Sequence, residues 1–136
     1  MTDISLTAAQ IAILPGAVTR RRTAGATITI GQVVYIASDG DAEPADGNVS
    51  AAAARGIGIA VESYDGETTV NAGDPVTVCV FGPVSGFSGA TPGSYGYLSD
   101  TVGRIGDSAG TFAFILGYFE SAGVFFVNPG IDDPTS

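Results

Sequence analysis

The sequence predicts an all-β fold: one small antiparallel β-barrel or sandwich, built from two duplicated units and preceded by an extended N-terminal arm. Short runs rich in β-branched and aromatic residues, separated by glycines, predict strands through most of the chain. No window of helix length carries apolar residues at helical spacing without a glycine interruption. A sequence motif also occurs twice, as GATITIGQVVYIASD at residues 25–39 and as GATPGSYGYLSD at residues 89–100.

The chain divides into three predicted segments. Residues 1–24 are predicted to form the arm, extended or with one short helical turn, because Pro15-Gly16 interrupts the apolar stretch TAAQIAIL. Residues 25–130 are predicted to form the β-domain, and residues 131–136 a polar tail. At 136 residues the chain has the length of one ordinary domain.

The first copy of the repeat contains a predicted strand pair, a loop and a hairpin. TITI and QVVYIAS form the pair, and PADGNVSAAAARG forms the loop, in which SAAAAR can make one helical turn. GIGIAVES follows as a strand, and its Gly56 and Gly58 predict either the close approach of another backbone or a bulge. Asp65-Gly66 predicts a two-residue hairpin that pairs IAVES with ETTVN. The alternating run PVTVCVF is the next predicted strand.

The second copy repeats this order. GSYGYLS corresponds to GQVVYIAS, AFILGYFES corresponds to ARGIGIAVES, and AGVFFVNPG is the predicted return strand of the second hairpin. Neither copy is large enough to bury its own apolar face, so the two are expected to close around one core. A plain two-sheet sandwich of the same strands is the alternative architecture.

The charge content favours a protein that binds other proteins. Only 14% of residues are charged, against roughly 25% in ordinary domains, which predicts that much of the surface faces other chains. The alternative is a compact glycine-rich protein with a polar, uncharged surface. A net charge of −9 argues against binding nucleic acid or an anionic membrane surface. No membrane span or signal peptide is recognised, so synthesis in the cytoplasm is expected.

The inventory of reactive side chains predicts no enzyme, no cofactor and no metal site. The chain has no histidine and no lysine, and Cys79 lies in an apolar run that predicts a buried structural thiol. Glu62 and Glu120 end equivalent strands, so a catalytic carboxylate pair is the enzymatic alternative. The acidic segment SDGDAEPADGN resembles the start of a calcium loop, but Pro44 stands where such a loop needs glycine. A polar surface loop is therefore expected there.

Two features predict contact with neighbouring chains. The first is the arm, whose apolar residues and single basic cluster are predicted to bind a partner: Ile11, Ile13, Leu14, Arg20, Arg21 and Arg22. A solvated turn is the alternative for the arginines. The second is the aromatic content of the second copy. In Tyr118-Phe119 and Phe125-Phe126 one ring must face the core and the other must face outward, either into a subunit interface or into a two-sided core.

These motifs, in this order, resemble the capsid cement, or head decoration, proteins of tailed bacteriophages. The similarity covers about residues 23 to 128, and the basic triplet and the arm lie outside its usual pattern. The matching segments are Gly25 to Tyr35, Gly58 to Ala60, Gly73 to Val78, Gly82 to Val84, Gly93 to Ile105 and Ile115 to Gly117.

The resemblance implies a structural virion protein without catalytic residues. Such a subunit forms homotrimers on the outer surface of the phage head, where it stabilises contacts between major capsid proteins after synthesis in the host cytoplasm. In this setting the arm is expected to add a strand to the capsid and its arginines to pair with capsid carboxylates. The alternative function is a carbohydrate- or host-binding β-module of a phage tail or cell surface.

Overall fold

A computed structural model describes residues 2–130, so the predicted tail at 131–136 lies outside the described residues. The described chain is all-β, as predicted; its one helical element is a 3-10 turn, η1, at Ala8–Gln10. No helix within the described part could cross a membrane. The strands are β1 Ser5–Leu6, β2 Ala12–Ile13, β3 Val18–Thr23, β4 Ile28–Thr29, β5 Val33–Ile36, β6 Ala42–Pro44, β7 Gly58–Ser63, β8 Thr69–Val70, β9 Pro75–Ser85, β10 Phe87–Ser88, β11 Tyr95–Leu98, β12 Ile105–Gly106, β13 Ile115–Phe119 and β14 Val124–Val127.

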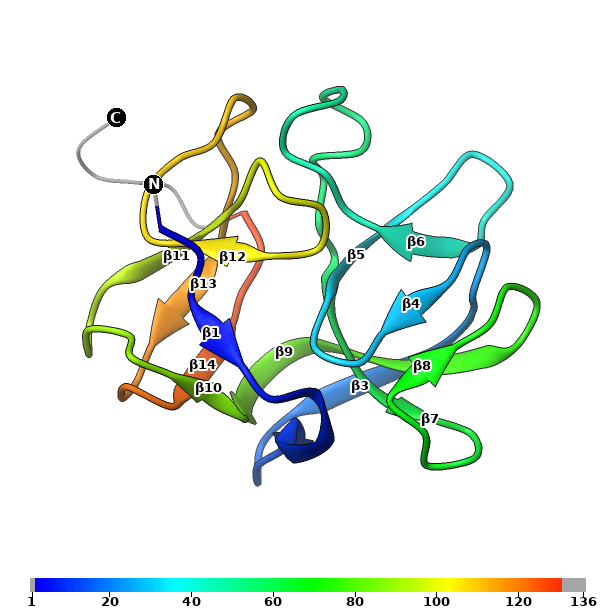
Figure 1. Cartoon of the computed structure of the whole chain (residues 1–136), viewed down its shortest axis with the longest axis horizontal. Helices are drawn as coiled ribbons and strands as arrows, with labels where there is room; N and C mark the ends of the chain where they lie inside the picture. The colour runs from blue at the N-terminus through cyan, green and yellow to red at the C-terminus, as the bar shows by residue number, and fades with distance from the viewer. Residues whose placement is uncertain (1, 131–136) are drawn as a thin grey trace.

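One curled antiparallel sheet contains most of these strands. Its order is β12-β11-β13-β14-β9-β7-β5-β6, and β2 and β3 also pair with β9. Two short ladders, β1 with β10 and β4 with β8, lie outside this path. Figure 1 shows two lobes, with β4 to β8 in one and β11 to β14 in the other, and the long strand β9 running between them.

The two lobes bear out the predicted duplication, but with other bounds: the first unit includes β3, which was predicted to belong to the arm, and the second begins within β9. The first unit consists of β3, β5, β6, β7 and residues 75–81 of β9; the second consists of residues 82–85 of β9, followed by β11, β12, β13 and β14. Numbered along the chain within each unit, the strands have the same spatial order: first, fifth, fourth, second, third. β9 therefore ends one unit and begins the next, which holds both units in one sheet.

The hairpins of the two units form differently. The second hairpin is as predicted, with β13 and β14 paired through Phe119↔Phe125 and Tyr118↔Phe126. In the first unit the chain does turn at Asp65-Gly66, where the Ser63 hydroxyl donates to the Glu67 carbonyl. The predicted pairing of IAVES with ETTVN is wrong, however, because β7 pairs with β9 and β8 pairs with β4.

Burial explains this correction. A strand of two residues offers β7 little apolar surface, whereas β9 offers it the fully buried Val76 and Val78. β8 instead brings Val70 opposite Ile28 on β4, and both side chains are buried. For the same reason TITI and QVVYIAS do not pair with each other: β5 lies between β6 and β7.

Close backbone contacts explain one glycine in the strand before the turn of each unit. A Cβ on Gly58 would collide with the Cys79 carbonyl of β9, as the glycine pattern predicted. A Cβ on Gly117 would collide with the Phe126 carbonyl of β14. In both units the strand before the turn therefore approaches its neighbour at a point where only glycine fits.

The core runs through both units. Ile28, Ile59 and Val78 are fully buried in the first unit, and Phe119 and Phe125 in the second. The rings of these two phenylalanines lie 4.7 Å apart and each contacts Phe87. Cys79 is fully buried and free, as predicted, and its burial raises the pKa of the thiol above the ordinary value.

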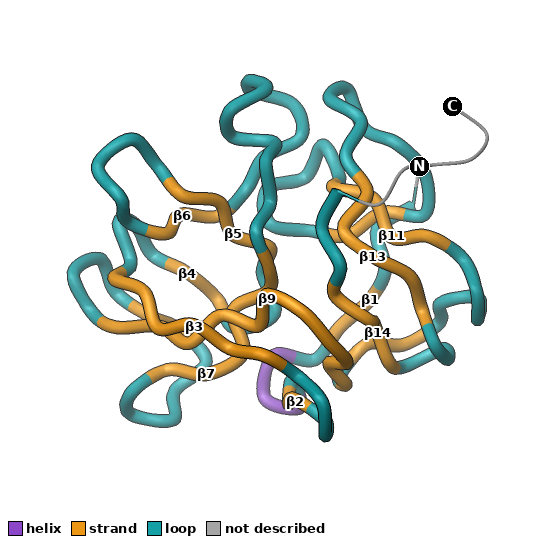
Figure 2. The backbone as a smooth tube through the Cα atoms, turned by 180° about the vertical axis from the view of Figure 1, so that it is seen from behind, coloured by secondary structure: helices purple, strands orange, loops and turns teal. Residues whose placement is uncertain are grey.

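The predicted arm is part of the β-domain rather than an appendage. β2 and β3 pair antiparallel with β9, and β1 pairs with β10. Figure 2 shows β3 on the near side of the molecule, beside β9, with β2 below it. Backbone amides and carbonyls of β9 would lack partners without this segment, which supplies the physical reason for docking. The predicted extended conformation and short helical turn both occur, in β3 and in η1.

Candidate interaction surface

The predicted arginine cluster lies on an edge strand. β3 pairs with β9 along one side, and no residue of the described chain forms a ladder with its other side. Arg20 and Arg21 are exposed, and Arg22 is half-buried. We call this outer side of β3, residues Val18–Thr23, the arginine edge.

The three arginines point to both faces of the sheet. Register places Arg21 opposite Thr77, which in turn lies opposite Glu62 on β7. Arg20 and Arg22 lie opposite the buried Val78 and Val76, on the core side of β3. Within residues 2–130 no guanidinium group of the three has a hydrogen bond or an ion pair, and the Nε of Arg22 is buried without a partner. The exposed guanidinium groups of Arg20 and Arg21 therefore remain available to an external carboxylate.

A second exposed feature crosses the second unit. Phe81, Phe126, Tyr118 and Tyr95 lie on neighbouring strands β9, β14, β13 and β11, and we call these four residues the aromatic band. Phe126 faces Phe81 edge-on at 5.0 Å and stacks on Tyr118 at 5.1 Å. Tyr118 and Tyr95 are direct cross-strand partners, so their side chains share one face of the sheet.

The band lies outside the core and carries no charge. Phe81 is 44% exposed, and the other three rings are half-buried. This confirms the prediction for the two doublets, because Phe119 and Phe125 face the core while Tyr118 and Phe126 face outward. Contiguous exposed aromatic surface of this kind is typical of protein interfaces.

The band and the arginine edge form one continuous surface. Val18, the first residue of β3, is 50% exposed and lies directly opposite Phe81. The uncharged band therefore leads into the basic strand without a break. The sequence predicted each part of this surface. Phe81 was assigned only to an alternating strand, because no local pattern indicates that the register shift between Val18 and Thr19 places Val18 opposite Phe81.

The three apolar residues predicted to bind a partner have different environments. Ile11 is only 8% exposed and belongs to the core, where it lies close to Gly31 and Gly86, so its assignment to a partner surface is wrong. Ile13 is 47% exposed. Leu14 is half-buried, and its amide donates to the Pro83 carbonyl.

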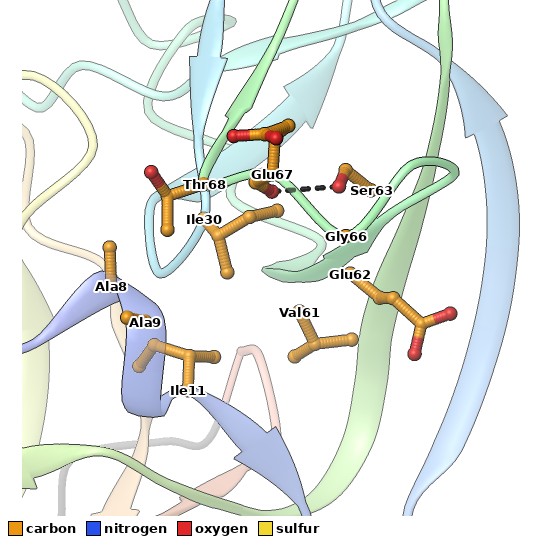
Figure 3. A pocket seen from close by; sticks show the side chains of 10 residues that line it. All are labelled: Ala8, Ala9, Ile11, Ile30, Val61, Glu62, Ser63, Gly66, Glu67 and Thr68. Atoms are coloured by element: carbon orange, nitrogen blue, oxygen red, sulfur yellow. Dashed lines mark hydrogen bonds between the residues drawn. The ribbon is translucent and has the colours of Figure 1, made fainter.

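A shallow depression of about 180 Å³ lies between η1 and the turn after β7 (Figure 3). Ile11, Ile30 and Val61 give it an apolar lining, while the carboxylate of Glu62 points away from Ala8 and Ala9. Glu120 does not line it. The two carboxylates of the enzymatic alternative belong to different units, on β7 and after β13.

The acidic segment has a structural explanation in its own backbone. Asp39 accepts a hydrogen bond from the Asp41 amide, and Asp46 accepts one from the Asn48 amide, as aspartates in turns commonly do. Among residues 2–130 no three potential metal ligands of the histidine, cysteine or carboxylate type are grouped together.

Comparison with known proteins adds no relative: no protein-family model matches the chain, and no curated protein matches it either.

Proposed function

We propose that this chain is a structural virion protein, a decoration subunit that binds the outer surface of a phage head as a trimer and stabilises contacts between major capsid proteins. The observation that carries the proposal is the continuous exposed surface formed by the aromatic band and the arginine edge. The resemblance of its sequence motifs to those of capsid cement proteins also supports the proposal.

The chemistry of this surface suits protein partners. Aromatic side chains supply large contact areas at low entropic cost, and arginines bind carboxylates with two parallel hydrogen bonds. Copies with a net charge of −9 repel one another, so contact between them is least unfavourable where the surface is uncharged, as it is on the band. We therefore assign the band to contacts within the decorated shell, between copies or with the capsid.

Stabilisation of a shell by this protein follows from mass action. If the subunit binds the expanded shell and not the unexpanded one, each occupied site adds free energy to the expanded state. Many copies acting together then oppose the internal pressure of packaged DNA. The protein need supply only complementary surface, and no chemical step.

The alternative, a carbohydrate-binding module, is less well supported by the ring geometry. Sugar stacking requires an open aromatic face, but Tyr118 and Phe126 are stacked on one another with an interplanar angle of 16°. Each ring therefore covers one face of the other. A glycan array separates the two functions, because a decoration subunit should bind no glycan on it.

The test measures co-sedimentation with expanded, DNA-free shells of the phage that encodes this chain. We expect the wild-type protein to pellet with shells and Phe126→Ser to lose most of its binding, because the band loses its central ring. Tyr64→Ser is the matched control, since Tyr64 is 62% exposed in the turn after β7 and lies outside the band. Equal binding by wild type and Phe126→Ser, or no binding by wild type, would reject the proposal.

A further inference from the structure

We propose that the arginine edge accepts an extended acidic segment of a partner protein as an additional strand. The segment comes from the partner, which reverses the expected direction of strand addition: this chain is the acceptor. If the proposed function is right, the partner is the major capsid protein. The chemistry of the site requires only an extended chain with carboxylates at alternate positions.

The backbone of β3 supports this assignment. Its inner side is paired with β9 from Val18↔Phe81 to Thr23↔Pro75, with one register shift between Val18 and Thr19, and this ladder holds the strand extended. Its outer side presents the unpaired amides and carbonyls of a six-residue strand. Edges of this length template the addition of another strand unless they are covered or blocked. No proline or glycine interrupts β3.

Charge selects an acidic occupant. Three of the five basic residues of the chain are consecutive here, in a protein whose net charge is −9. A strand added to β3 places its side chains directly opposite those of Arg20, Arg21 and Arg22, alternately on the two faces. Carboxylates at every second position of that strand would therefore contact either Arg20 and Arg22 on one face of the sheet or Arg21 on the other.

The same charges disfavour a second copy as the occupant. Two β3 strands paired with each other would bring arginines opposite arginines, and like charges directly opposite are destabilising. The acidic edge strand of another copy is β6, which contains Glu43. Its outer side is already engaged within its own chain, because Ala42 bridges Ala24 and accepts a hydrogen bond from the Gly25 amide.

The experiment titrates the isotope-labelled full-length protein with a synthetic peptide of about eight residues, long enough to span the whole edge and within the usual range of strand lengths, in which threonine and glutamate alternate. A peptide in which lysine replaces glutamate is the control. We expect the glutamate peptide alone to bind, with affinity falling as salt is added, and to slow hydrogen exchange of β3 amides.

Variants then distinguish peptide binding at the arginine edge from a general effect of the protein's net charge. Arg20→Gln combined with Arg21→Gln should weaken peptide binding by about tenfold, since in either register of the peptide one charge-assisted contact is lost. Arg55→Gln is the control for a single lost charge, because Arg55 is exposed in the loop between β6 and β7. A thermal unfolding curve for each variant establishes that it is folded.

Three results would overturn the proposal. These are equal binding of the glutamate and lysine peptides, peptide binding that leaves β3 exchange unchanged, and slow exchange of β3 amides in the free protein through concentration-dependent self-association. The peptide assay contains no shells, so it tests only whether the arginine edge accepts an acidic strand. The decoration function is tested separately, by co-sedimentation with shells.

Discussion

The two units have the same strand order but leave different surfaces open. In the first unit the first strand is β3, and its outer side is free. In the second unit the first strand is the end of β9, and β2 covers its outer side through Ala12↔Ser85 and Ile13↔Val84. The first unit thus exposes a basic backbone edge, whereas the second exposes the aromatic band on a sheet face.

The difference indicates that one architecture has been adapted twice through its edges and turns rather than through its core. The chain from η1 to β3 runs antiparallel to β9, and it closes one unit while forming the open edge of the other. The turns differ in the same way. The connection from β7 to β9 is long and contains β8, which pairs with β4, while the connection from β13 to β14 is a short turn.

The largest expected effect comes from removing the shared N-terminal segment. A chain without residues 1–22 loses β1, β2 and most of β3, so both units lose backbone partners along β9 and the core loses Ile11. We expect a loss on the order of 5 kcal/mol, comparable to the whole stability of many domains. Circular dichroism melting measures it. A truncated protein that melts within a few degrees of wild type would contradict the docked arrangement.

Adjacent phenylalanines in β14 give a sharper contrast within the second unit. Phe125→Ala removes a fully buried ring and should cost about 3–5 kcal/mol in the free energy of unfolding. Phe126→Ala alters the outward face, and we expect a loss of about 1 kcal/mol. Chemical denaturation of both variants tests this. Equal losses would mean that the band is packed like core, and the separation between inner and outer faces would be wrong.

The smallest expected effect concerns the thiol on the strand shared by both units. Burial raises the pKa of Cys79, so the folded state holds the neutral thiol at a pH where the unfolded chain has begun to ionise. This contribution to stability is therefore present below the unfolded pKa and decreases as the pH rises above about 9. Cys79→Ala should show a shallower loss of melting temperature with alkaline pH than wild type.

The reactivity of the same thiol tests whether the units unfold together. We expect a thiol reagent to modify Cys79 only at the rate of global unfolding, because β3 and β7 cover it on both sides. Fast modification under conditions where the near-ultraviolet signal of the second-unit aromatics persists would show that the first unit opens alone.

Prediction from sequence succeeded where the relevant physics is local. Alternation along a strand places neighbouring side chains on opposite faces, which sufficed to separate Phe119 from Tyr118. Turn chemistry at Asp65-Gly66 located the chain reversal, and glycine at position 58 indicated a close backbone contact. Each inference depends on a few adjacent residues and does not require knowledge of distant partners.

Prediction failed where strands had to choose partners. Backbone amides and carbonyls are nearly identical in every strand, so pairing depends on the apolar surface that each combination buries. That sum includes contacts between distant residues, such as Val70 opposite Ile28 and the packing of Ile11, a residue of the arm, into the core, which no local pattern identifies. The docking of residues 5–23 on β9 and β10 also depends on the apolar surface that distant residues bury together, and this docking sets the boundary of the domain.

The sequence by itself determined the all-β class, the duplication and the alternation of inward and outward side chains, because strand propensity and the two-residue period are properties of short segments. Only the tertiary structure decided which edges are covered and which remain open. The arginines therefore became a candidate site only once β9 had occupied one side of β3 and left the other side free, since the exposure of an edge is a property of the whole sheet.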